Sequence, residues 1–306
     1  MSTKKRNHHY VWQHYLSPWT NDKKIWCLRN GKAFHTSTEN IALERDFYKI
    51  KAISQRDIEF IKALASRQHF GVLNKFNDWW IVTLKLISDL HAGLANNEKQ
   101  ANEVAHELDV LAHNFEEDYH EMIERTSINY TKSILKEDLS FFDDDHGRAE
   151  FSYYLCMQFV RTKKIQENVF LAFKDAERQL GVNINNSWPL MRNINAVSIA
   201  YSLFSQRKYK IVLLKNTSDI NFITGDQPVF NTHAVEQFGK EIPASTEFYY
   251  ALSPRIAILI TDDQRFQNLY EIELNDSAVG GYNNFVKQVS YEQIYSCTQE
   301  CLMPFM

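Results

Sequence analysis

The sequence has few cysteines and no long apolar run, and each absence excludes a class of protein. Its four cysteines are scattered except for Cys297 and Cys301, whose Cys-x-x-x-Cys spacing lacks the second Cys or His pair of a zinc site. We therefore expect reduced thiols. No apolar run approaches the roughly 18 to 20 residues of a membrane span, and no apolar signal core follows the amino end. These absences predict a cytoplasmic protein without a membrane partner.

Positive charge is not in excess, and no named catalytic motif is present. The net charge is -4, so any binding to nucleic acid has to be local. The basic runs Lys4–Arg6 and Arg207–Lys210 are short, and such runs are usually only solvent-exposed surface segments that aid solubility. The sequence has no Walker loop, Rossmann fingerprint, nucleophile elbow, His-Glu-x-x-His motif or zinc-finger spacing. No motif therefore names a reaction.

Apolar and aromatic side chains, in contrast, are abundant. With 306 residues, 44% apolar and 13% aromatic, the chain can bury a substantial core as one large or two ordinary domains. The stretch Asn7–Trp19 already holds His8, His9 and His14 among large aromatic residues, where many chains have a polar tail. Its aromatic residues are expected to be core or docking contacts more than a base-stacking platform: Tyr10, Trp12, Tyr15 and Trp19.

Local patterns predict strands at both ends and helices between them. Asn30-Gly31 separates two strand-like runs, 24–28 and 33–36, and is the strongest short signal for a hairpin turn. Ser54-x-x-Asp57 resembles a capping box, and from there to about residue 206 apolar residues recur at helical spacing. One amphipathic stretch carries Trp79, Val82 and Leu86, and the next carries Val104, Leu108, Leu111 and Phe115. A further helix is expected from near Gly147 to Arg161. Trp188-Pro189 should break the helical pattern before a last helix that ends near Phe204.

The last third returns to strand period, and it completes the predicted fold. Strands are expected at 209–214, 220–224, 248–252 and 256–260, followed by a helix from Asn275 to Tyr295 and then a short strand or a frayed end. We predict an α+β fold with a central helical region and a mainly antiparallel sheet built from the N-terminal hairpin and C-terminal strands. Three regions are expected: residues 1–53 with the histidine motif and hairpin, the helical region 54–206, and the β-rich region 207–306. Regions 1–53 and 207–306 should pack together, and the whole chain should fold as one cooperative unit. This arrangement would bring His8 or His9 near Asp226.

Several of these motifs, in order along nearly the whole chain, resemble one bacterial family. They are His8-His9-Tyr10-Val11 with Tyr15-Leu16, Arg45–Tyr48, Arg161-Thr162, Phe222–Pro228, and Asn283 ahead of Ile294-Tyr295. The chain is similar to DUF4238, a family of unknown function that opens with His-His-Tyr-Val-Pro. Trp12 and Lys163 stand where that family often has proline, which changes backbone stiffness more than side-chain chemistry. The resemblance implies a shared fold and supplies no established activity.

Four polar residues from distant segments, His8, His9, Arg161 and Asp226, form the hypothetical catalytic set. A histidine supplies a base near neutral pH, an arginine fits phosphate, and an aspartate holds a divalent ion or orients a histidine. This combination suits a nuclease or related phosphodiester hydrolase that uses Mg²⁺ or Mn²⁺, with Asp226 as the metal ligand. Polar positions in the same motifs are the expected substrate-binding residues: Tyr10, Thr162, Gln227 and Asn283.

Structural roles compete with these catalytic ones. Adjacent residues of an extended segment point to opposite faces, so one of His8 and His9 is expected to be structural. Gly225 allows an unusual backbone angle before Asp226, whose carboxylate is more readily explained as a turn cap. His14 is expected at the surface. The alternative function is a non-catalytic sensor that binds a nucleotide or a partner, and the sequence identifies no protein partner.

Two clusters that contain carboxylates are expected to be solvent-exposed and not to bind a metal. His113-x-x-x-Glu117-x-x-His120-Glu121-x-x-Glu124 includes the Glu-x-x-His spacing of di-iron bundles, but it occurs only once, which favours a solvated helix face. Asp143 to Asp145 is expected to be a solvated acidic loop. A role in a bacterial phage-defence or toxin system is a hypothesis about context that no residue supports.

Overall fold

The computed structural model describes residues 3–68, 70–95, 102–236, 243 and 245–306, and they form two compact units of three segments each. Unit 1 comprises Met1–His8, Glu44–Arg125 and Ile165–Ile199, and unit 2 comprises His9–Leu43, Thr126–Lys164 and Ala200–Met306. Three of the five boundaries fall inside helices of the predicted helical region: α4 (Asn102–Leu135), α6 (Lys163–Leu180) and α7 (Ile184–Ser205). The units therefore differ from the regions expected at residues 53 and 206. That the chain unfolds as one cooperative unit stays a prediction.

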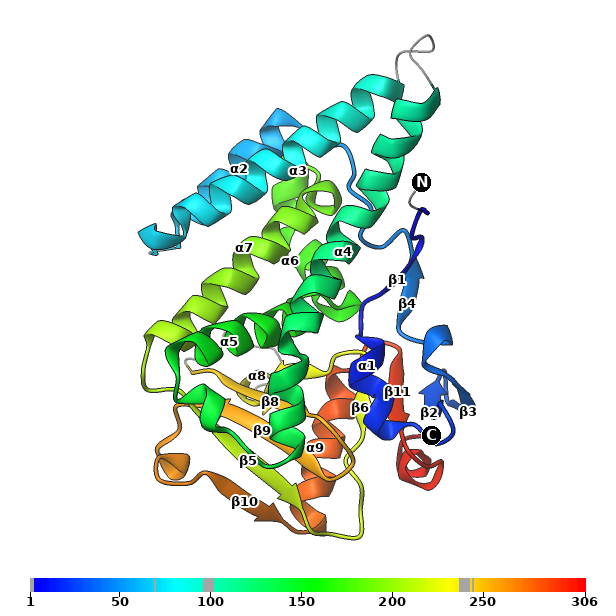
Figure 1. The fold of residues 1–306 in the computed structure, drawn as a ribbon, viewed down its shortest axis with the longest axis vertical. Helices are drawn as coiled ribbons and strands as arrows, with labels where there is room; N and C mark the ends of the chain where they lie inside the picture. Colours follow the sequence, from blue (N-terminus) through cyan, green and yellow to red (C-terminus); the bar gives the residue numbers. More distant parts are fainter. Residues whose placement is uncertain (1–2, 69, 96–101, 237–242, 244) are drawn as a thin grey trace. The chain divides into compact units, whose positions relative to one another are not determined.

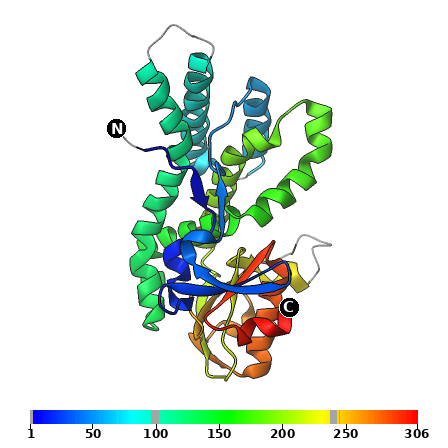
Figure 2. The same cartoon turned by 90° about the vertical axis from the view of Figure 1, so that its right-hand side faces the viewer.

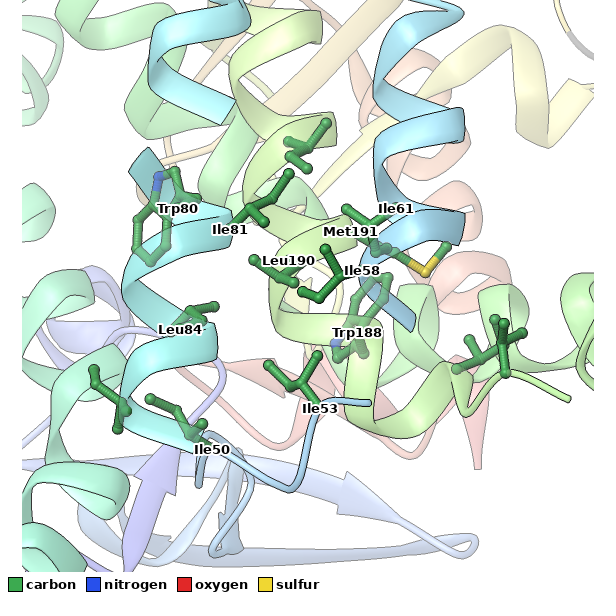
Figure 3. Packing of buried hydrophobic residues seen from close by; sticks show 14 of the residues in the cluster. Ile50, Ile53, Ile58, Ile61, Trp80, Ile81, Leu84, Trp188, Leu190 and Met191 are labelled. Atoms are coloured by element: carbon green, nitrogen blue, oxygen red, sulfur yellow. The ribbon is translucent and has the colours of Figure 1, made fainter. Parts of the chain in front are cut away.

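Unit 1 is built on helices that bury one continuous apolar core. It contains α2 (Gln55–Ser66) and α3 (Asn74–Ala95) together with parts of α4, α6 and α7. Helix α2 begins with the predicted capping box: the Ser54 hydroxyl accepts from the Asp57 amide at 3.1 Å, and the Asp57 carboxylate accepts from the Ser54 amide at 2.8 Å. Figure 3 shows side chains of α2, α3 and α7 meeting in this core.

The buried face of α3 is not the predicted one. Trp79, Val82 and Leu86 are 49%, 65% and 56% exposed, whereas the neighbouring Trp80 and Leu84 are fully buried in the core of unit 1 (Figure 3). Helix α3 is apolar on more than one side, so helical spacing indicates the helix without selecting the side that packs. The same happens in α4, where Val104 and Leu111 are exposed.

Among its described residues, unit 2 contains two sheets. One has the strand order β10-β5-β9-β8-β7 and the other has β3-β2-β11-β6; every pair is antiparallel except β10 with β5 (Figure 1). Their bounds are β2 (Lys24–Arg29), β3 (Lys32–Ser37), β5 (Lys210–Asn216), β6 (Thr224–Gly225), β7 (Val229–Asn231), β8 (Glu247–Ala251), β9 (Ile256–Thr261), β10 (Glu271–Leu274) and β11 (Gln293–Ser296). The α+β class and the mainly antiparallel pairing are confirmed.

The predicted hairpin is present and joins a C-terminal strand. Asn30 and Gly31 have φ of 52° and 70°, the positive values that a two-residue turn of this kind requires, and Arg29 pairs with Lys32. Strand β11 then pairs with β2 on one side and with β6 on the other. In Figure 2 the blue hairpin crosses in front beside the red β11. The other C-terminal strands form their own sheet, so the single predicted sheet is two.

Other local predictions need correction. Pro189 lies inside α7 and does not break it; the missing N–H removes one intrahelical hydrogen bond, and the helix continues to Ser205. Residues 220–223 are not a strand, so β6 is shorter than expected. The helix predicted to reach Tyr295 ends at Val289, because β11 forms over Gln293–Ser296. Asp143, Asp144 and Asp145 are exposed as expected, but Asp145 already belongs to α5 (Asp145–Val160), which Asp144 caps by accepting from the Gly147 amide at 2.9 Å.

The remaining elements complete the chain. They are β1 (Asn7–His9), α1 (Gln13–Leu16), β4 (Leu43–Arg45), α8 (Thr232–Glu236), α9 (Asp276–Val289) and short 3-10 turns, the last of which spans Glu300–Phe305. Strands β1 and β4 pair with each other. Within the described ranges, the helices lack the combination of length and apolar character that crossing a membrane requires.

Candidate functional site

His8 is a buried structural residue of unit 1. Its Nδ1 accepts a hydrogen bond from the Tyr48 amide at 2.8 Å, so the ring proton sits on Nε2, which donates to the Lys5 carbonyl at 3.1 Å. The side chain is fully buried, and burial lowers its pKa to about 4. The imidazole is therefore neutral at pH 7 and both nitrogens are engaged. One of the two adjacent histidines was expected to have this kind of role.

A buried polar cluster surrounds Tyr48 in unit 1. The Tyr48 ring centroid lies 5.5 Å from that of His8 and 4.6 Å from that of His120, and the Arg192 guanidinium lies 4.7 Å from it. His113, His120 and Glu124 are also buried, so the prediction of a solvated helix face on α4 is wrong for them. Sequence reasoning did not identify Arg192, because the only sign of a buried polar role is a single charged residue within an apolar stretch of α7.

His9 and Arg161 meet in unit 2. Arg161 Nη2 donates to the His9 carbonyl at 2.6 Å, and the Gln13 amide nitrogen lies 2.8 Å from His9 Nε2. The His9 ring is half-buried, and burial, followed by the charge of Arg161, lowers its pKa. The Arg161 guanidinium thus binds the backbone of His9, while the His9 ring, with its lowered pKa, contacts the Gln13 side chain.

Thr162 and Gln227 form a buried link from the end of α5 to the turn before β7. The Thr162 hydroxyl donates to the Gln227 side-chain carbonyl. The Gln227 amide nitrogen in turn donates to the carbonyls of Phe159 at 3.0 Å and Val229 at 2.7 Å. Both side chains are buried, and these contacts hold Arg161, at the carboxyl end of α5, in position.

Asp226 fastens the segment that leads into β11. Its carboxylate accepts from three consecutive backbone amides, those of Tyr291 at 2.7 Å, Glu292 at 2.7 Å and Gln293 at 2.9 Å. Burial raises the pKa of Asp226 to about 6, while these three amide bonds lower it. The carboxylate therefore caps a distant segment instead of its own turn. Three or more potential metal-ligating side chains do not gather anywhere in the described part of the chain.

Gly225, next to Asp226, is required for space. A Cβ at this position would lie 2.0 Å from the Ser290 hydroxyl and 3.1 Å from the Gln293 carbonyl. Its φ is not in the left-handed region, contrary to the expectation of an unusual backbone angle. The glycine instead lets β6 approach the chain on either side of the amides that Asp226 binds.

Tyr10 and Asn283 also have partners in unit 2. The Gln293 side-chain nitrogen lies 3.4 Å from the Tyr10 hydroxyl, and Asn283 donates to the Asn221 carbonyl at 2.9 Å and accepts from the Ile223 amide at 3.0 Å. All predicted site residues except His8 thus belong to unit 2. Most of their polar atoms hold the backbone in place.

A cavity of about 180 Å³ lies beside the aromatic motif in unit 2, where no site was predicted. Trp12, His14, Tyr15, Thr131, Lys132 and Leu252 are among its lining residues. The Trp12 and His14 rings lie 4.8 Å apart, and burial, followed by the charge of Lys132, lowers the pKa of His14. Tyr10, Tyr15 and Trp19 are buried as expected, whereas Trp12 is only half-buried and lines the cavity. Lys132 lies far from the motif in sequence, so no signal pointed to it.

The basic runs already have acidic partners within their own units. Lys5 Nζ lies 2.7 Å from Asp118 and 2.9 Å from Glu121 in unit 1. Arg207 Nη2 lies 2.6 Å from Asp145 in unit 2. These ion pairs support the expectation that the short basic runs are solvent-exposed surface segments. The surroundings of Trp12 are therefore a better candidate than these runs for binding an anionic ligand.

The fold and its buried polar links define an α+β protein whose two units are each assembled from distant segments. The chain belongs to the family DUF4238, described as a protein of unknown function, whose model matches residues 7–300. The resemblance drawn from the sequence motifs is confirmed. Neither a curated protein nor a solved structure matches the chain.

Proposed function

We propose that the protein binds a phosphate-bearing aromatic ligand, a nucleotide or one nucleotide unit of a nucleic acid, in the cavity beside Trp12. The observation that carries this proposal is the joint placement of Trp12, His14 and Lys132 around one cavity of unit 2. An indole face stacks on any nucleobase, and a lysine ammonium attracts phosphate. This proposal gives the non-catalytic alternative, a sensor that binds a nucleotide, a specific binding place.

The size and charge of the cavity limit the ligands that it can bind. Its volume of about 180 Å³ is below the roughly 300–1,000 Å³ of pockets for drug-sized ligands, so it suits a single ring system. Lys132 is exposed, and a phosphate beside it can remain partly in water. His14 has a lowered pKa and is mainly neutral at pH 7, so Lys132 supplies the charge while the imidazole offers a hydrogen bond or a stacking face.

Phosphodiester hydrolysis is the second candidate function, and the observation that favours it is the bond from Arg161 to the backbone carbonyl of His9, which brings the two residues to one place in unit 2. A neutral imidazole accepts a proton, and a guanidinium stabilises negative charge that develops on phosphate. The proposed nuclease would use His9 as base and Arg161 as the cation. Mg²⁺ and Mn²⁺ stay part of this proposal as assay conditions. A role in phage defence or as a toxin is proposed only as a context in which such cleavage would act.

Binding is tested with the full chain and fluorescent single-stranded RNA, single-stranded DNA and free nucleotides over a range of salt concentrations. Trp12→Ala is expected to weaken binding by about 5- to 150-fold, the equivalent of one lost base stack. Lys132→Gln is expected to lower the slope of log K against log salt by about one. Lys287→Gln, an exposed lysine of α9, is the matched control and should change neither. Wild-type binding by both cavity variants, or no binding of any probe, contradicts the proposal.

Cleavage is tested with the same polymers in EDTA, Mg²⁺ or Mn²⁺. The hydrolase proposal predicts product with the wild type and none with His9→Asn, at unchanged affinity. Arg161 is buried, so its Lys variant needs a check of folding by circular dichroism. Binding without cleavage under every condition supports the sensor function and rejects the hydrolase.

A further inference from the structure

Cys297 and Cys301 lie together just after β11 in unit 2. All four cysteines are in the described ranges and carry free thiols, but only these two are half-buried, while Cys27 and Cys156 are fully buried. The Asn221 side-chain nitrogen lies within hydrogen-bond distance of both sulfurs of the pair. The pair therefore combines a shared polar neighbour with partial access to solvent, which the other two thiols lack.

Polar donors converge on these sulfurs. The Asn221 side-chain nitrogen lies 3.4 Å from Cys297 Sγ and 3.9 Å from Cys301 Sγ, and the Thr298 hydroxyl donates to Cys301 Sγ at 3.4 Å. Hydrogen bonds donated to sulfur stabilise the thiolate relative to the thiol. The two thiols are not equivalent: only Cys301 accepts from Thr298, and its pKa is lowered by the neighbouring Cys297, whereas the pKa of Cys297 is raised by Cys301.

The two remaining thiols provide an internal comparison. Burial raises the pKa of Cys27 to about 12, and it also raises the pKa of Cys156. A buried, protonated thiol is a poor nucleophile. The chain thus contains one thiol suited to attack, one adjacent thiol suited to follow it, and two inert ones.

We propose that Cys301 and Cys297 form a dithiol site that reduces low-molecular-weight disulfides. The Cys301 thiolate attacks one sulfur of the small disulfide, a Cys301–small-thiol mixed disulfide forms, and the first small thiolate leaves and takes up a proton. The Cys297 thiol then loses its proton to water and attacks Cys301 Sγ, which expels the second small thiolate. The products are a Cys297–Cys301 disulfide and two small thiols, so two electrons pass from the protein to the small disulfide.

This site is independent of the proposed ligand cavity. It requires only thiol–disulfide exchange, and the small disulfide is itself the oxidant. Asn221, which contacts both sulfurs, also accepts a hydrogen bond from Asn283 through its backbone carbonyl. Asn221, on the segment that leads into β6, therefore contacts the dithiol, which lies after β11.

Oxidised glutathione is the probe for the test with the full chain. Under native conditions, mass spectrometry should find the wild type lighter by two hydrogen atoms, with a peptide that contains the Cys297–Cys301 disulfide. Cys297→Ser should stop at the glutathione adduct on Cys301, and Cys301→Ser should form neither product. A persistent adduct in the wild type, or a disulfide formed equally well without Cys301, overturns the proposal.

Alkylation by iodoacetamide at pH 6.5 gives a second measurement that does not require disulfide formation. Cys301 should react about tenfold or more faster than the thiol of free glutathione, because a thiol with a lowered pKa is ionised at that pH. Thr298→Val removes one donor and should slow Cys301 at least twofold. Thr217→Val, an exposed threonine of unit 2, is the matched control. Equal rates for Cys301 and glutathione overturn the proposal.

Discussion

Arg192 and Glu116 form a buried ion pair in unit 1, with 2.6 Å between Arg192 Nη2 and Glu116 Oε1 and 1% exposure of each side chain. Arg192 Nε and Glu116 Oε2 have no hydrogen-bond partner in the described part of the chain, although Asn193 adds a bond of 3.2 Å to Oε1. Burial of two charges is costly unless each compensates the other. The pair therefore makes unit 1 sensitive to the loss of either partner.

Removal of one partner should strongly destabilise the protein. Glu116→Ala is expected to lower the free energy of unfolding by about 3–5 kcal/mol, because it leaves the Arg192 charge buried alone. The double variant Glu116→Met/Arg192→Met should cost less than the sum of Glu116→Met and Arg192→Met. Urea denaturation followed by circular dichroism measures each variant. Asp89→Ala, which breaks the more exposed Lys85–Asp89 pair of α3, should cost about 0.3–0.5 kcal/mol; an equal loss in Glu116→Ala would contradict the argument.

His8 should make stability depend on pH. Its pKa is lowered to about 4 in the folded protein, from about 6.5 in the unfolded chain, so the unfolded state binds more protons between these values. The stabilisation is therefore complete above pH 6.5 and is lost as the pH falls through 4, by at most about 3 kcal/mol.

His8→Asn is the variant that tests this dependence. The Asn side chain can still accept from the Tyr48 amide but does not titrate. Denaturation midpoints at pH 7 and pH 4.5 should fall further for the wild type than for His8→Asn. Parallel losses in the two proteins would show that His8 does not contribute to the pH dependence.

Asp226 should matter to stability whether or not the protein is an enzyme. Asp226→Asn replaces an acceptor of three amide protons by a group with one carbonyl oxygen, so at least one buried amide loses its partner. The expected loss is about 1–3 kcal/mol in free energy of unfolding. Asp219→Asn, at an exposed position of unit 2, should stay within about 0.5 kcal/mol. An unchanged Tm in Asp226→Asn would contradict the structural role.

Two glycines of unit 2 should respond to alanine in opposite directions. Gly225→Ala places a methyl group against Ser290 and Gln293 and should cost about 1–3 kcal/mol as an overpacked site. Gly280 lies in α9 with open space around an added Cβ, so Gly280→Ala should stabilise by about 0.5–1 kcal/mol. Differential scanning calorimetry distinguishes these outcomes, and a stabilising Gly225→Ala would show that the close approach is not rigid.

Local chemistry made much of the fold predictable. Asn30-Gly31 predicts the hairpin because few residue pairs adopt two successive positive φ angles, and Ser54 with Asp57 predicts the start of α2 because each side chain satisfies the amide of the other. Packing partners were not predictable in the same way. The side of α3 that is buried depends on α2 and α7, and an apolar spacing such as Trp79, Val82 and Leu86 says nothing of them.

The candidate site was only partly accessible to sequence reasoning. Residue types identified His9 and Arg161, which the structure brings together, but they do not tell whether a carboxylate faces a ligand or a row of amides, as Asp226 does. Lys132 and Trp12 approach one cavity from distant positions in the sequence. Such a meeting depends on tertiary structure, and no local pattern records it.

The position of β11 between β2 and β6 has a consequence for synthesis. A ribosome adds about 5–20 residues per second, so the hairpin is complete long before its partner strand is made. During that time β2 carries an edge of unpaired amide and carbonyl groups, the kind of edge that recruits other chains. A premature stop codon before Gln293 would make this edge permanent, so truncated products are expected to aggregate or to be degraded instead of persisting as shorter soluble proteins.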